Sequence, residues 1–377
     1  MDINHLSTPT LILDKARLQR NIDAMAERVK ALGVDLRPHL KTTKSADVAR
    51  LAVDGNFGGI TVATMREAEY FLENGITDIT YAVCIVPSKL DQALSLVDRG
   101  ADLKLLTDNA DVAGAIAGHG GLFKVLIEID CGEHRTGVLP DSPELLEIAG
   151  ILAAGEKTEL AGVLTHAGHT YACRSKDEII VVAEDERAAA VLAADRIREA
   201  GHPCPTVSTG STPSVMFARN TDGVTEVRPG VYMLGDMFQV GIGTRSIDEV
   251  ALTVLTSVIA HRRDDNQLYI DAGGLALSKD RATAAFKGDD DVGYGLVCDL
   301  KTTKPIAGLR VASVHQEHGL VTGDRPLPFD DLPVGSKVRI MPNHVCMTAA
   351  AYDSYNVIDG DGGFGEVTAV WGRCNGW

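Results

Sequence analysis

Residues 36–45 read LRPHLKTTKS, and the place of this stretch in the chain decides the fold that the sequence predicts. It begins with an apolar run typical of a strand, and Pro38 fixes φ just before His39. Lys41 and Lys44 follow, ahead of the next predicted helix. A lysine directly after a strand, at the mouth of a barrel, can be desolvated enough to lose its proton and attack a carbonyl. A solvated turn with two surface cations would have the same sequence, so the interpretation depends on the rest of the chain.

On both sides of this stretch, short apolar runs alternate with amphipathic helical segments. Helical patterns include 15–32, which ends at Gly33 as a C-terminal glycine predicts, and 65–74 and 176–200. Eight such strands predict an α/β protein with a (β/α)8 TIM-type barrel, and this number favours a barrel over a doubly wound open sheet. The eight strand candidates are 36–39, 59–63, 78–83, 103–107, 124–130, 162–165, 206–209 and 225–228.

The last third of the chain has a different pattern, with strand-like runs and no long helices between them. Glycine-rich turns at 272–274 and 359–363 separate some of these runs. The pattern predicts a barrel domain at 9–244 and a C-terminal mostly-β domain at 245–377, against which residues 1–8 pack. The strand candidates of the second domain are 251–259, 267–271, 309–315, 337–341 and 365–371.

The composition, with 45% hydrophobic and 23% charged residues, is that of a soluble globular protein. A formal net charge of −16 and the lack of a basic cluster exclude nucleic acid as a partner. No segment approaches the roughly 18 apolar residues of a membrane span, and the N-terminus does not resemble a signal peptide, so we expect a cytoplasmic protein without a membrane partner. Seven cysteines without CxxC spacing predict a reduced compartment and no disulfides.

Polar residues gather where the predicted barrel strands end. Because the carboxyl ends of parallel barrel strands meet at one mouth, we expect these groups to lie together with Lys41. The groups are DCGEHRTG at 130–137, THAGHTY at 165–171, TGSTPS at 209–214 and RPGVY at 228–232.

Two of these groups predict a phosphate site. The turn at 210–212 opens a short helix, so backbone N–H groups, hydroxyls and a helix N-terminus would converge on one anion, and the amides at 230–231 would add a second pair. An ordinary helix N-cap has the same Gly-Ser-Thr pattern. The residues of the predicted site are Gly210, Ser211, Thr212, Gly230, Val231 and Tyr232.

Three further side chains suit pyridoxal phosphate, an aromatic aldehyde that a lysine can hold as a Schiff base. His166 can lie against the ring, Arg135 can donate to the phenolate oxygen, and Tyr171 can act as an acid or base near the Schiff base. Simpler explanations exist for each: a hydrogen-bonded strand-end His, a surface ion pair and a packed tyrosine ring.

The second predicted domain contains a candidate metal pair in PNHVC at 342–346. His344 and Cys346 are two residues apart, so both side chains would point to one face if the segment is a strand. Imidazole and thiolate suit zinc, and two protein ligands leave positions for water and substrate. A buried Cys beside a hydrogen-bonded His is also common without a metal.

RPHLKTTK, DCGEHRTG, LTHAGH and TGSTPS resemble the motifs of fold-type III pyridoxal-phosphate enzymes, in the branch of D-serine dehydratase and D-threonine aldolase. The resemblance covers most of the chain, from residue 8 to about 344. It implies that Lys41 holds the cofactor, that Arg135 contacts its O3′ oxygen and that Tyr171 lies near the reacting carbon. Arg228, in VRPG, resembles an arginine that meets the pyridine nitrogen in related racemases and that cannot accept a proton.

The resemblance also implies a divalent metal on His344 and Cys346. Zinc is the first candidate, with magnesium, manganese and cobalt as alternatives. The dehydratases have His then Cys at these positions and typical threonine aldolases have His then Asp, so Cys346 favours a dehydratase. Related enzymes are homodimers, and we expect a homodimer here.

The expected function is metal-dependent β-elimination from a small-molecule D-3-hydroxy amino acid: D-serine, D-threonine or D-threo-3-hydroxyaspartate. Lys41 would take the α-proton while the metal helps the β-hydroxyl to leave, giving a 2-keto acid and ammonia. An aldolase that forms glycine and an aldehyde could use the same metal. Which groups select the β-substituent stays open, with His315 and His318 as candidates.

Three other functions fit parts of the sequence. An alanine racemase would use a tyrosine of the second domain in place of the metal pair. A non-catalytic cofactor-binding protein would resemble the barrel alone. A zinc-dependent barrel hydrolase would use strand-end ligands such as His39 and His166.

Overall fold

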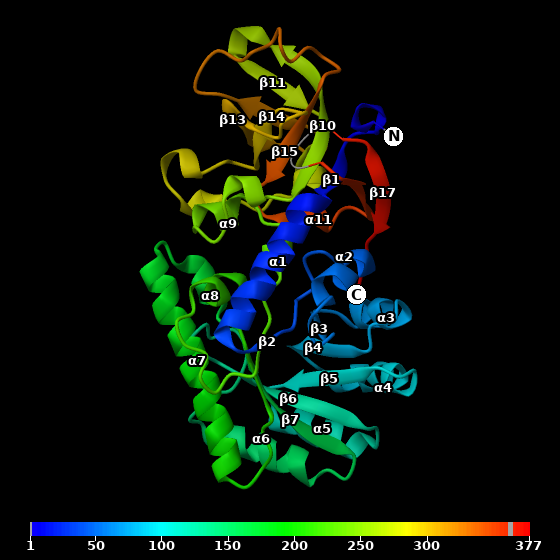
Figure 1. Cartoon of the computed structure of the whole chain (residues 1–377), viewed down its shortest axis with the longest axis vertical. Coiled ribbons are helices and arrows are strands. Elements are labelled where there is room, and N and C mark those ends of the chain that lie inside the picture. Colours follow the sequence, from blue (N-terminus) through cyan, green and yellow to red (C-terminus); the bar gives the residue numbers. More distant parts are fainter. Residues whose placement is uncertain (1, 361–364) are drawn as a thin grey trace. The chain divides into compact units, whose positions relative to one another are not determined.

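The strands expected in the first two thirds of the chain form one parallel sheet in the computed structural model, which describes residues 2–360 and 365–377 (Figure 1). They are β2 (Asp35–Leu36), β3 (Ile60–Val62), β4 (Asp78–Cys84), β5 (Asp102–Thr107), β6 (Phe123–Ile129), β7 (Thr158–Thr165), β8 (Thr206–Thr209) and β9 (Glu226–Val227). Their pairing order is β2-β9-β8-β7-β6-β5-β4-β3, and a bridge between His39 and Thr61 joins the two ends of this order. The predicted barrel is therefore confirmed.

Helices alternate with these strands, and local signals in the sequence account for their ends. The side chain of Thr64 caps α3 by accepting from the Glu67 N–H, and Gly33 takes a φ of 71° directly after α1. The helices are α1 (Lys15–Leu32), α2 (Ala46–Val53), α3 (Met65–Glu73), α4 (Leu90–Asp98), α5 (Ala110–His119), α6 (Pro143–Ala154), α7 (Lys176–Glu199) and α8 (Thr212–Phe217), with 3-10 turns η2 (Pro87–Lys89) and η3 (Gly168–Ala172).

The stretch that follows β2 continues the pairing of the barrel. The N–H groups of Arg37 and His39 donate to carbonyls on the β9 side, and that of Leu40 donates to Thr61 on the β3 side, each at 2.9 Å. Lys41 is the first residue beyond these bonds. The barrel therefore places Lys41 at the carboxyl end of its first strand, as the sequence predicted.

The rest of the strands form a nine-stranded sheet in the order β11-β14-β13-β12-β15-β10-β1-β16-β17. Most of its neighbours pair antiparallel, but β1 is parallel to β16. The strands are β1 (Thr10–Asp14), β10 (Leu252–Arg262), β11 (Gln267–Ile270), β12 (Gly295–Cys298), β13 (Pro305–Val314), β14 (Gly319–Thr322), β15 (Lys337–Pro342), β16 (Ser354–Ile358) and β17 (Val367–Gly372). Short helical turns lie between them: η1 (Ile3–His5), η4 (Val231–Met233), α9 (Met237–Gly241), η5 (Ile247–Glu249), η6 (Arg263–Asp265), α10 (Gly274–Leu277), η7 (Ala282–Ala285), η8 (Gly288–Asp290) and α11 (Val345–Ala349).

This sheet contains the five strands expected after residue 244 and three that the sequence did not indicate, β12, β14 and β16. These three are only four or five residues long, so each shows too little alternation to be recognised. The predicted turn at 359–363 lies partly outside the described residues.

The contacts within the chain divide it into two compact units. We call them the β unit (Met1–Asp23 and Val231–Arg373) and the barrel unit (Ala24–Gly230 and Cys374–Trp377). In the β unit Ile3 packs with Ile12, Leu255 and Ile358. The sequence-based domain bounds, 9–244 and 245–377, differ from these cuts and stay a prediction. Across residues 2–360 and 365–377, no helix has both the length and the apolar character that crossing a membrane requires.

Candidate active site

Lys41 is exposed at the end of the β2 segment. Its backbone N–H donates to Nδ1 of His39 at 3.4 Å, so this ring nitrogen is an acceptor. Lys44 has a different role, because its ammonium pairs with the fully buried carboxylate of Glu67 at 2.8 Å. Of the two lysines, Lys41 is the one whose amine is accessible.

His39 and His166 are half-buried imidazoles at the ends of the β2 and β7 segments. Burial lowers the pKa of each ring well below its usual value, and the positive charges of Lys41 and Arg228 lower both further. The charge of Arg135 also lowers the pKa of His166. Both rings are therefore neutral at pH 7. Lys41, Arg228 and Arg135 come from different strand ends, and the charges of all three lower the pKa of His166. This proximity is expected if the polar groups share one barrel mouth.

Arg228 is a buried cation held by neighbouring strand ends. Its guanidinium donates to Ser208 Oγ at 2.6 Å and to the carbonyls of Thr209 at 3.2 Å and Thr165 at 2.5 Å. Burial lowers the pKa of Arg228 to about 10, although nearby carboxylates, Glu226 foremost, favour its charge. The guanidinium is therefore charged at neutral pH and has a fixed orientation.

Arg135 and Tyr171 lie on the loops after β6 and β7. Arg135 is exposed and pairs with Glu133 at 3.6 Å. Tyr171 is half-buried in η3, and its ring centroid lies 6.5 Å from that of His166 at an angle of 44°. Both residues are thus near His166, in agreement with the expected grouping.

The turn at 210–212 is tightly built. Gly210 has a φ of 101°, and a Cβ there would lie 2.9 Å from the Val215 side chain, so only glycine fits. Ser211 caps α8 in a reciprocal capping box with Ser214. The Gly210 N–H donates to Glu186 Oε1 at 3.1 Å, and the Ser211 N–H donates to Ser214 Oγ at 2.8 Å. Two amides that the sequence assigned to a phosphate therefore have partners within the protein.

The second predicted pair of amides begins at Gly230. A Cβ on Gly230 would lie 2.7 Å from the carbonyl oxygen of His39, so a side chain is excluded there. Val231 and Tyr232 belong to the β unit and are buried. Burial raises the pKa of the Tyr232 hydroxyl, which keeps it protonated.

The candidate metal pair does not lie on a strand. β15 ends at Pro342, His344 is the N-cap residue of α11, and Cys346 lies in the first turn of that helix. The strand expectation was wrong, because the Val345 N–H at the start of the helix finds a buried acceptor, Asp236 Oδ2, at 2.9 Å. His344 and Cys346 nevertheless interact with each other.

Carboxylates surround this pair within the β unit. Asp280 Oδ2 lies 2.5 Å from Nδ1 of His344. Burial opposes the charge of His344, but the hydrogen bond with Cys346 and the charges of Cys346 and Asp236 raise its pKa to about 10. The pair is therefore a site where positive charge is stabilised.

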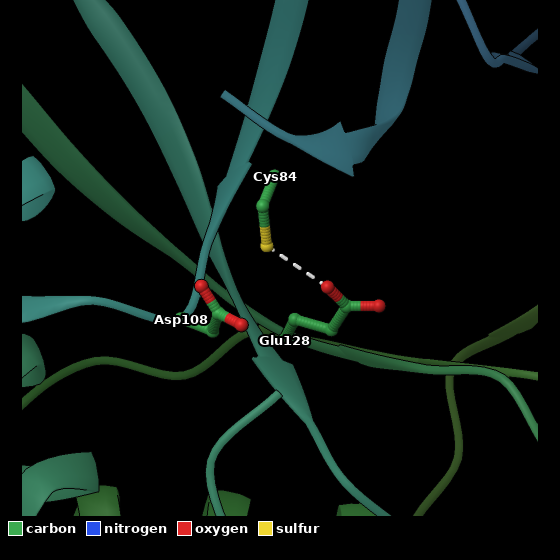
Figure 2. A group of neighbouring side chains, drawn as sticks. All are labelled: Cys84, Asp108 and Glu128. Atoms are coloured by element: carbon green, nitrogen blue, oxygen red, sulfur yellow. Dashed lines mark hydrogen bonds between the residues drawn. The ribbon is translucent and has the colours of Figure 1, made fainter. Parts of the chain in front are cut away.

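A third group of side chains lies at strand ends of the barrel, and Figure 2 shows Cys84 and Glu128 pointing toward one another beside Asp108. Cys84 Sγ donates to Glu128 Oε2 at 2.9 Å. The ligand atoms of the three residues lie within 4.8 Å of one another, the one such group of three among the described residues, so they could reach one metal ion. Burial and the charge of Glu128 raise the pKa of Cys84, which keeps the thiol protonated and makes it a hydrogen-bond donor.

The sequence did not single out Cys84, Asp108, Glu128 or Glu186. Cys84 ends β4 and Asp108 directly follows β5, so both satisfy the rule that polar strand ends face the barrel mouth. Applying that rule to every strand would have found these two. Glu186 lies in the middle of α7 and has no such signal.

Two family descriptions match the chain. Residues 13–237 match the N-terminal domain of alanine racemase, and residues 251–358 match a putative serine dehydratase domain. A D-threo-3-hydroxyaspartate dehydratase from Delftia sp. (strain HT23) is 44% identical, over 99% of this chain and 98% of the relative. A D-serine dehydratase from Dictyostelium discoideum is 30% identical, over 96% of this chain and 95% of the relative. A 3-hydroxy-D-aspartate aldolase from Paracoccus denitrificans (strain Pd 1222) is also 30% identical, over 98% and 92%.

Solved structures resemble the whole chain. The structure of the Delftia dehydratase has a TM-score of 0.95 with 43% identity and covers 100% of both chains. Two further structures are of D-threo-3-hydroxyaspartate dehydratase variants, a cysteine-to-alanine variant in the metal-free form and a histidine-to-alanine variant, altered two residues apart.

Proposed function

Because the chain belongs to the alanine-racemase-like family that includes D-serine and D-threo-3-hydroxyaspartate dehydratases, we propose that it is a pyridoxal-phosphate-dependent lyase. The proposed reaction is dehydration and deamination of a D-3-hydroxy amino acid to a 2-keto acid and ammonia. D-threo-3-hydroxyaspartate is the first substrate to test, since the relative of that name is 44% identical along almost the entire length of both chains.

One observation in the structure carries this proposal: an accessible Lys41 shares its surroundings with two neutral imidazoles and two arginines. Pyridoxal phosphate has a phosphate and a phenolate oxygen, so a site for it needs cations and hydrogen-bond donors around a flat ring. Arg228 and Arg135 supply positive charge, and neutral His166 can lie against a ring without adding charge. The residues present therefore fit the cofactor.

We assign Lys41 as the residue that holds the cofactor covalently, with the neighbouring groups as its non-covalent contacts. For the phosphate we retain Thr212 and the amides of Gly230 and Val231, together with Tyr232. Gly210 and Ser211 would shape the turn, because their amides already have protein partners. The assigned contacts are Arg135, His166, Tyr171, Gly210, Ser211, Thr212, Arg228, Gly230, Val231 and Tyr232.

The residues of the chain have distinct parts in this reaction. Bound pyridoxal phosphate supplies an electron sink that stabilises negative charge at the substrate Cα. Once the substrate amine has released Lys41 from the cofactor, the freed Lys41 amine would take the proton from Cα while hydroxide leaves from Cβ. The resulting enamine would then be hydrolysed by water to the 2-keto acid and ammonia. Tyr171 can donate or accept a proton near the reacting carbon. Arg228 cannot accept a proton, so it presents only donors and charge.

The β unit would hold the divalent metal through His344 and Cys346. The altered His and Cys in two variants of D-threo-3-hydroxyaspartate dehydratase have the same spacing as this pair, and the structure of the cysteine variant is a metal-free form, which supports the assignment. Asp280 would orient His344 through Nδ1, as a carboxylate hydrogen-bonded to a metal-bound imidazole does. Zinc suits an imidazole and a thiolate best, with magnesium, manganese and cobalt as alternatives. The metal would stabilise the departing hydroxide.

The second candidate function is aldol cleavage, which the 30% identical 3-hydroxy-D-aspartate aldolase favours. The two reactions differ in the bond that breaks: the dehydratase loses the Cα proton and the Cβ hydroxyl, whereas the aldolase breaks Cα–Cβ. Incubation with D-threo-3-hydroxyaspartate distinguishes them, because ammonia and a 2-keto acid indicate dehydration and glycine with an aldehyde indicates cleavage.

Replacement of Lys41 by Met tests the proposal as a whole. Wild-type protein loaded with pyridoxal phosphate should keep the cofactor on one peptide after borohydride reduction, and Lys41→Met should lose both this adduct and turnover. Lys44→Arg retains the charge beside Glu67 and is the matched control, which should keep both. Full turnover by Lys41→Met would exclude the proposed role of this lysine.

We also propose that the protein is a homodimer and that it is cytoplasmic. The family resemblance and the composition support these two proposals. Light scattering on the purified holoenzyme tests the first: a mass of about twice the chain mass is expected, and the mass of a single chain would contradict it.

A further inference from the structure

Glu186 is a carboxylate in the middle of α7 whose side chain is only 2% exposed. A single oxygen, Oε1, accepts the N–H of Ala167 at 2.8 Å and the N–H of Gly210 at 3.1 Å. Ala167 follows His166 directly, and Gly210 opens the turn that leads to Thr212. One buried side chain therefore links the loop after β7 to the loop after β8.

Burying a carboxylate is unfavourable unless hydrogen bonds or charges compensate for the lost water. Burial raises the pKa of Glu186, and the bonds from Ala167, Ser214 and Gly210, together with the charge of Arg228, oppose this rise. The structure therefore provides Glu186 with several donors inside the barrel unit. A surface carboxylate would need none of them.

The same two loops also meet through hydroxyl groups. Ser211 Oγ lies 3.1 Å from Thr170 Oγ1 and 3.0 Å from Ser214 Oγ. Thr170 Oγ1 also lies 2.7 Å from the Ala167 carbonyl, to which it donates. These contacts lie between buried residues, so a shift of one loop would break bonds made by the other.

A second carboxylate, that of Glu133, bonds to the loop after β7 but not to the loop after β8. Glu133 Oε2 accepts the Gly168 N–H at 3.1 Å, and a Cβ on Gly168 would lie 2.1 Å from Glu133 Oε1. Two successive amides, those of Ala167 and Gly168, are thus held by two different carboxylates. Only Glu186 of these two also bonds to the turn at Gly210.

We infer that Glu186 is a positioning residue that fixes the distance between the His166 imidazole and the phosphate-binding turn at 210–212. The inference rests on the proposed function, in which the ring of pyridoxal phosphate lies against His166 and its phosphate at Thr212. A cofactor with both groups needs the two loops at the correct separation. Pyridoxal, which has the ring but no phosphate, does not need it.

The test compares the affinities of apoprotein variants for pyridoxal phosphate and for pyridoxal. The absorbance of the bound aldehyde measures the binding of each. Glu186→Ala should weaken binding of pyridoxal phosphate by about 30-fold, the size expected when a charged hydrogen bond is lost, and binding of pyridoxal by less than about 3-fold. Glu186→Gln should stay within about 3-fold of wild type for both, because its carbonyl oxygen can accept the same two N–H groups.

Controls separate this role from general stability. Glu184→Ala removes an exposed carboxylate of the same helix that pairs with Arg187, and it should leave both affinities unchanged. If Glu186→Ala does not fold, Glu186→Asp keeps the charge but shortens the reach, and it should still weaken pyridoxal phosphate selectively. Equal losses for both aldehydes, or no loss for either, in the variant that folds would overturn the inference. Wild-type protein that binds neither aldehyde would instead contradict the proposed function.

Discussion

At the scale of single residues, the two lysines of the 36–45 stretch differ in their surroundings rather than in their chemistry. Lys44 adopts a φ of 47° and neutralises a carboxylate that has no exposure to solvent, whereas Lys41 is exposed beside two imidazoles. Glu67 Oε2 also accepts the Ala63 N–H at 2.9 Å, so this carboxylate connects the ends of two barrel segments. Lys44 is therefore a structural residue, and Lys41 is available for chemistry.

Removal of the buried carboxylate should show this difference. Glu67→Ala leaves the Lys44 ammonium half-buried without its partner and should lower the free energy of unfolding by about 3 kcal/mol. Glu69→Ala removes a half-exposed partner of Arg99 and should cost less than about 1 kcal/mol. Urea unfolding followed by circular dichroism measures both, and equal losses would contradict a special role for the buried pair.

The neutral imidazoles predict a pH effect on stability. Because the pKa of His166 in the folded protein lies well below its unfolded value of about 6.5, the unfolded state binds more protons below that pH. Stability should therefore fall as the pH decreases from 6.5 towards the folded pKa, by up to about 1.4 kcal/mol per pH unit for this residue. His166→Asn should make the unfolding midpoint less sensitive between pH 6.5 and 5. Parallel pH curves for the two proteins would show that His166 is not held neutral.

At the scale of elements, the loop after β8 begins with a backbone conformation that few residues can adopt. Gly210 combines a positive φ with close neighbours on three sides, and Ser211 provides the cap of α8. These are local features of a short turn. Their bonds to Glu186 on α7 and to Thr170 in η3 are not local, and they join three elements into one support.

Gly210→Ala should therefore destabilise the protein, by roughly 1–3 kcal/mol, because the new Cβ meets both an unfavourable φ and the Val215 side chain. Gly150→Ala is the matched substitution, since Gly150 lies within α6 with nothing near its Cβ position. It should stabilise by about 0.5–1 kcal/mol, as alanine does in a helix interior. Thermal unfolding of both variants measures the two changes in stability. Shifts of the unfolding midpoint in the same direction would contradict the prediction.

At the scale of the whole molecule, the barrel unit and the β unit contribute different chemistry to the proposed reaction. The barrel unit contains Lys41 and most of the proposed cofactor contacts, and the β unit contains His344 and Cys346 with their carboxylate neighbours. Cofactor binding and metal binding should therefore be separable.

Treatment of the holoenzyme with a chelator should abolish formation of keto acid and ammonia while the absorbance of the bound aldehyde persists. Addition of zinc should restore activity, and Cys346→Ala should not recover because one ligand is missing. The control is Cys204→Ala, a change at a buried thiol of the barrel unit outside the pair. Full activity of the metal-free protein would contradict metal dependence.

The sequence by itself determined the number of barrel strands, the position of Lys41 after the first of them, the glycine that ends the helix at 15–32, and the spacing of His344 and Cys346. These features depend on residues close together in the chain, where periodicity, turn residues and capping act directly. The tertiary structure decided the rest: that β1 joins the nine-stranded sheet, that Cys346 lies on a helix, that Lys44 neutralises Glu67, and that Glu186 links two loops. Such pairings join residues distant in sequence, and only the closing of the sheets brings their polar groups within bonding distance, which is why no local pattern indicates them.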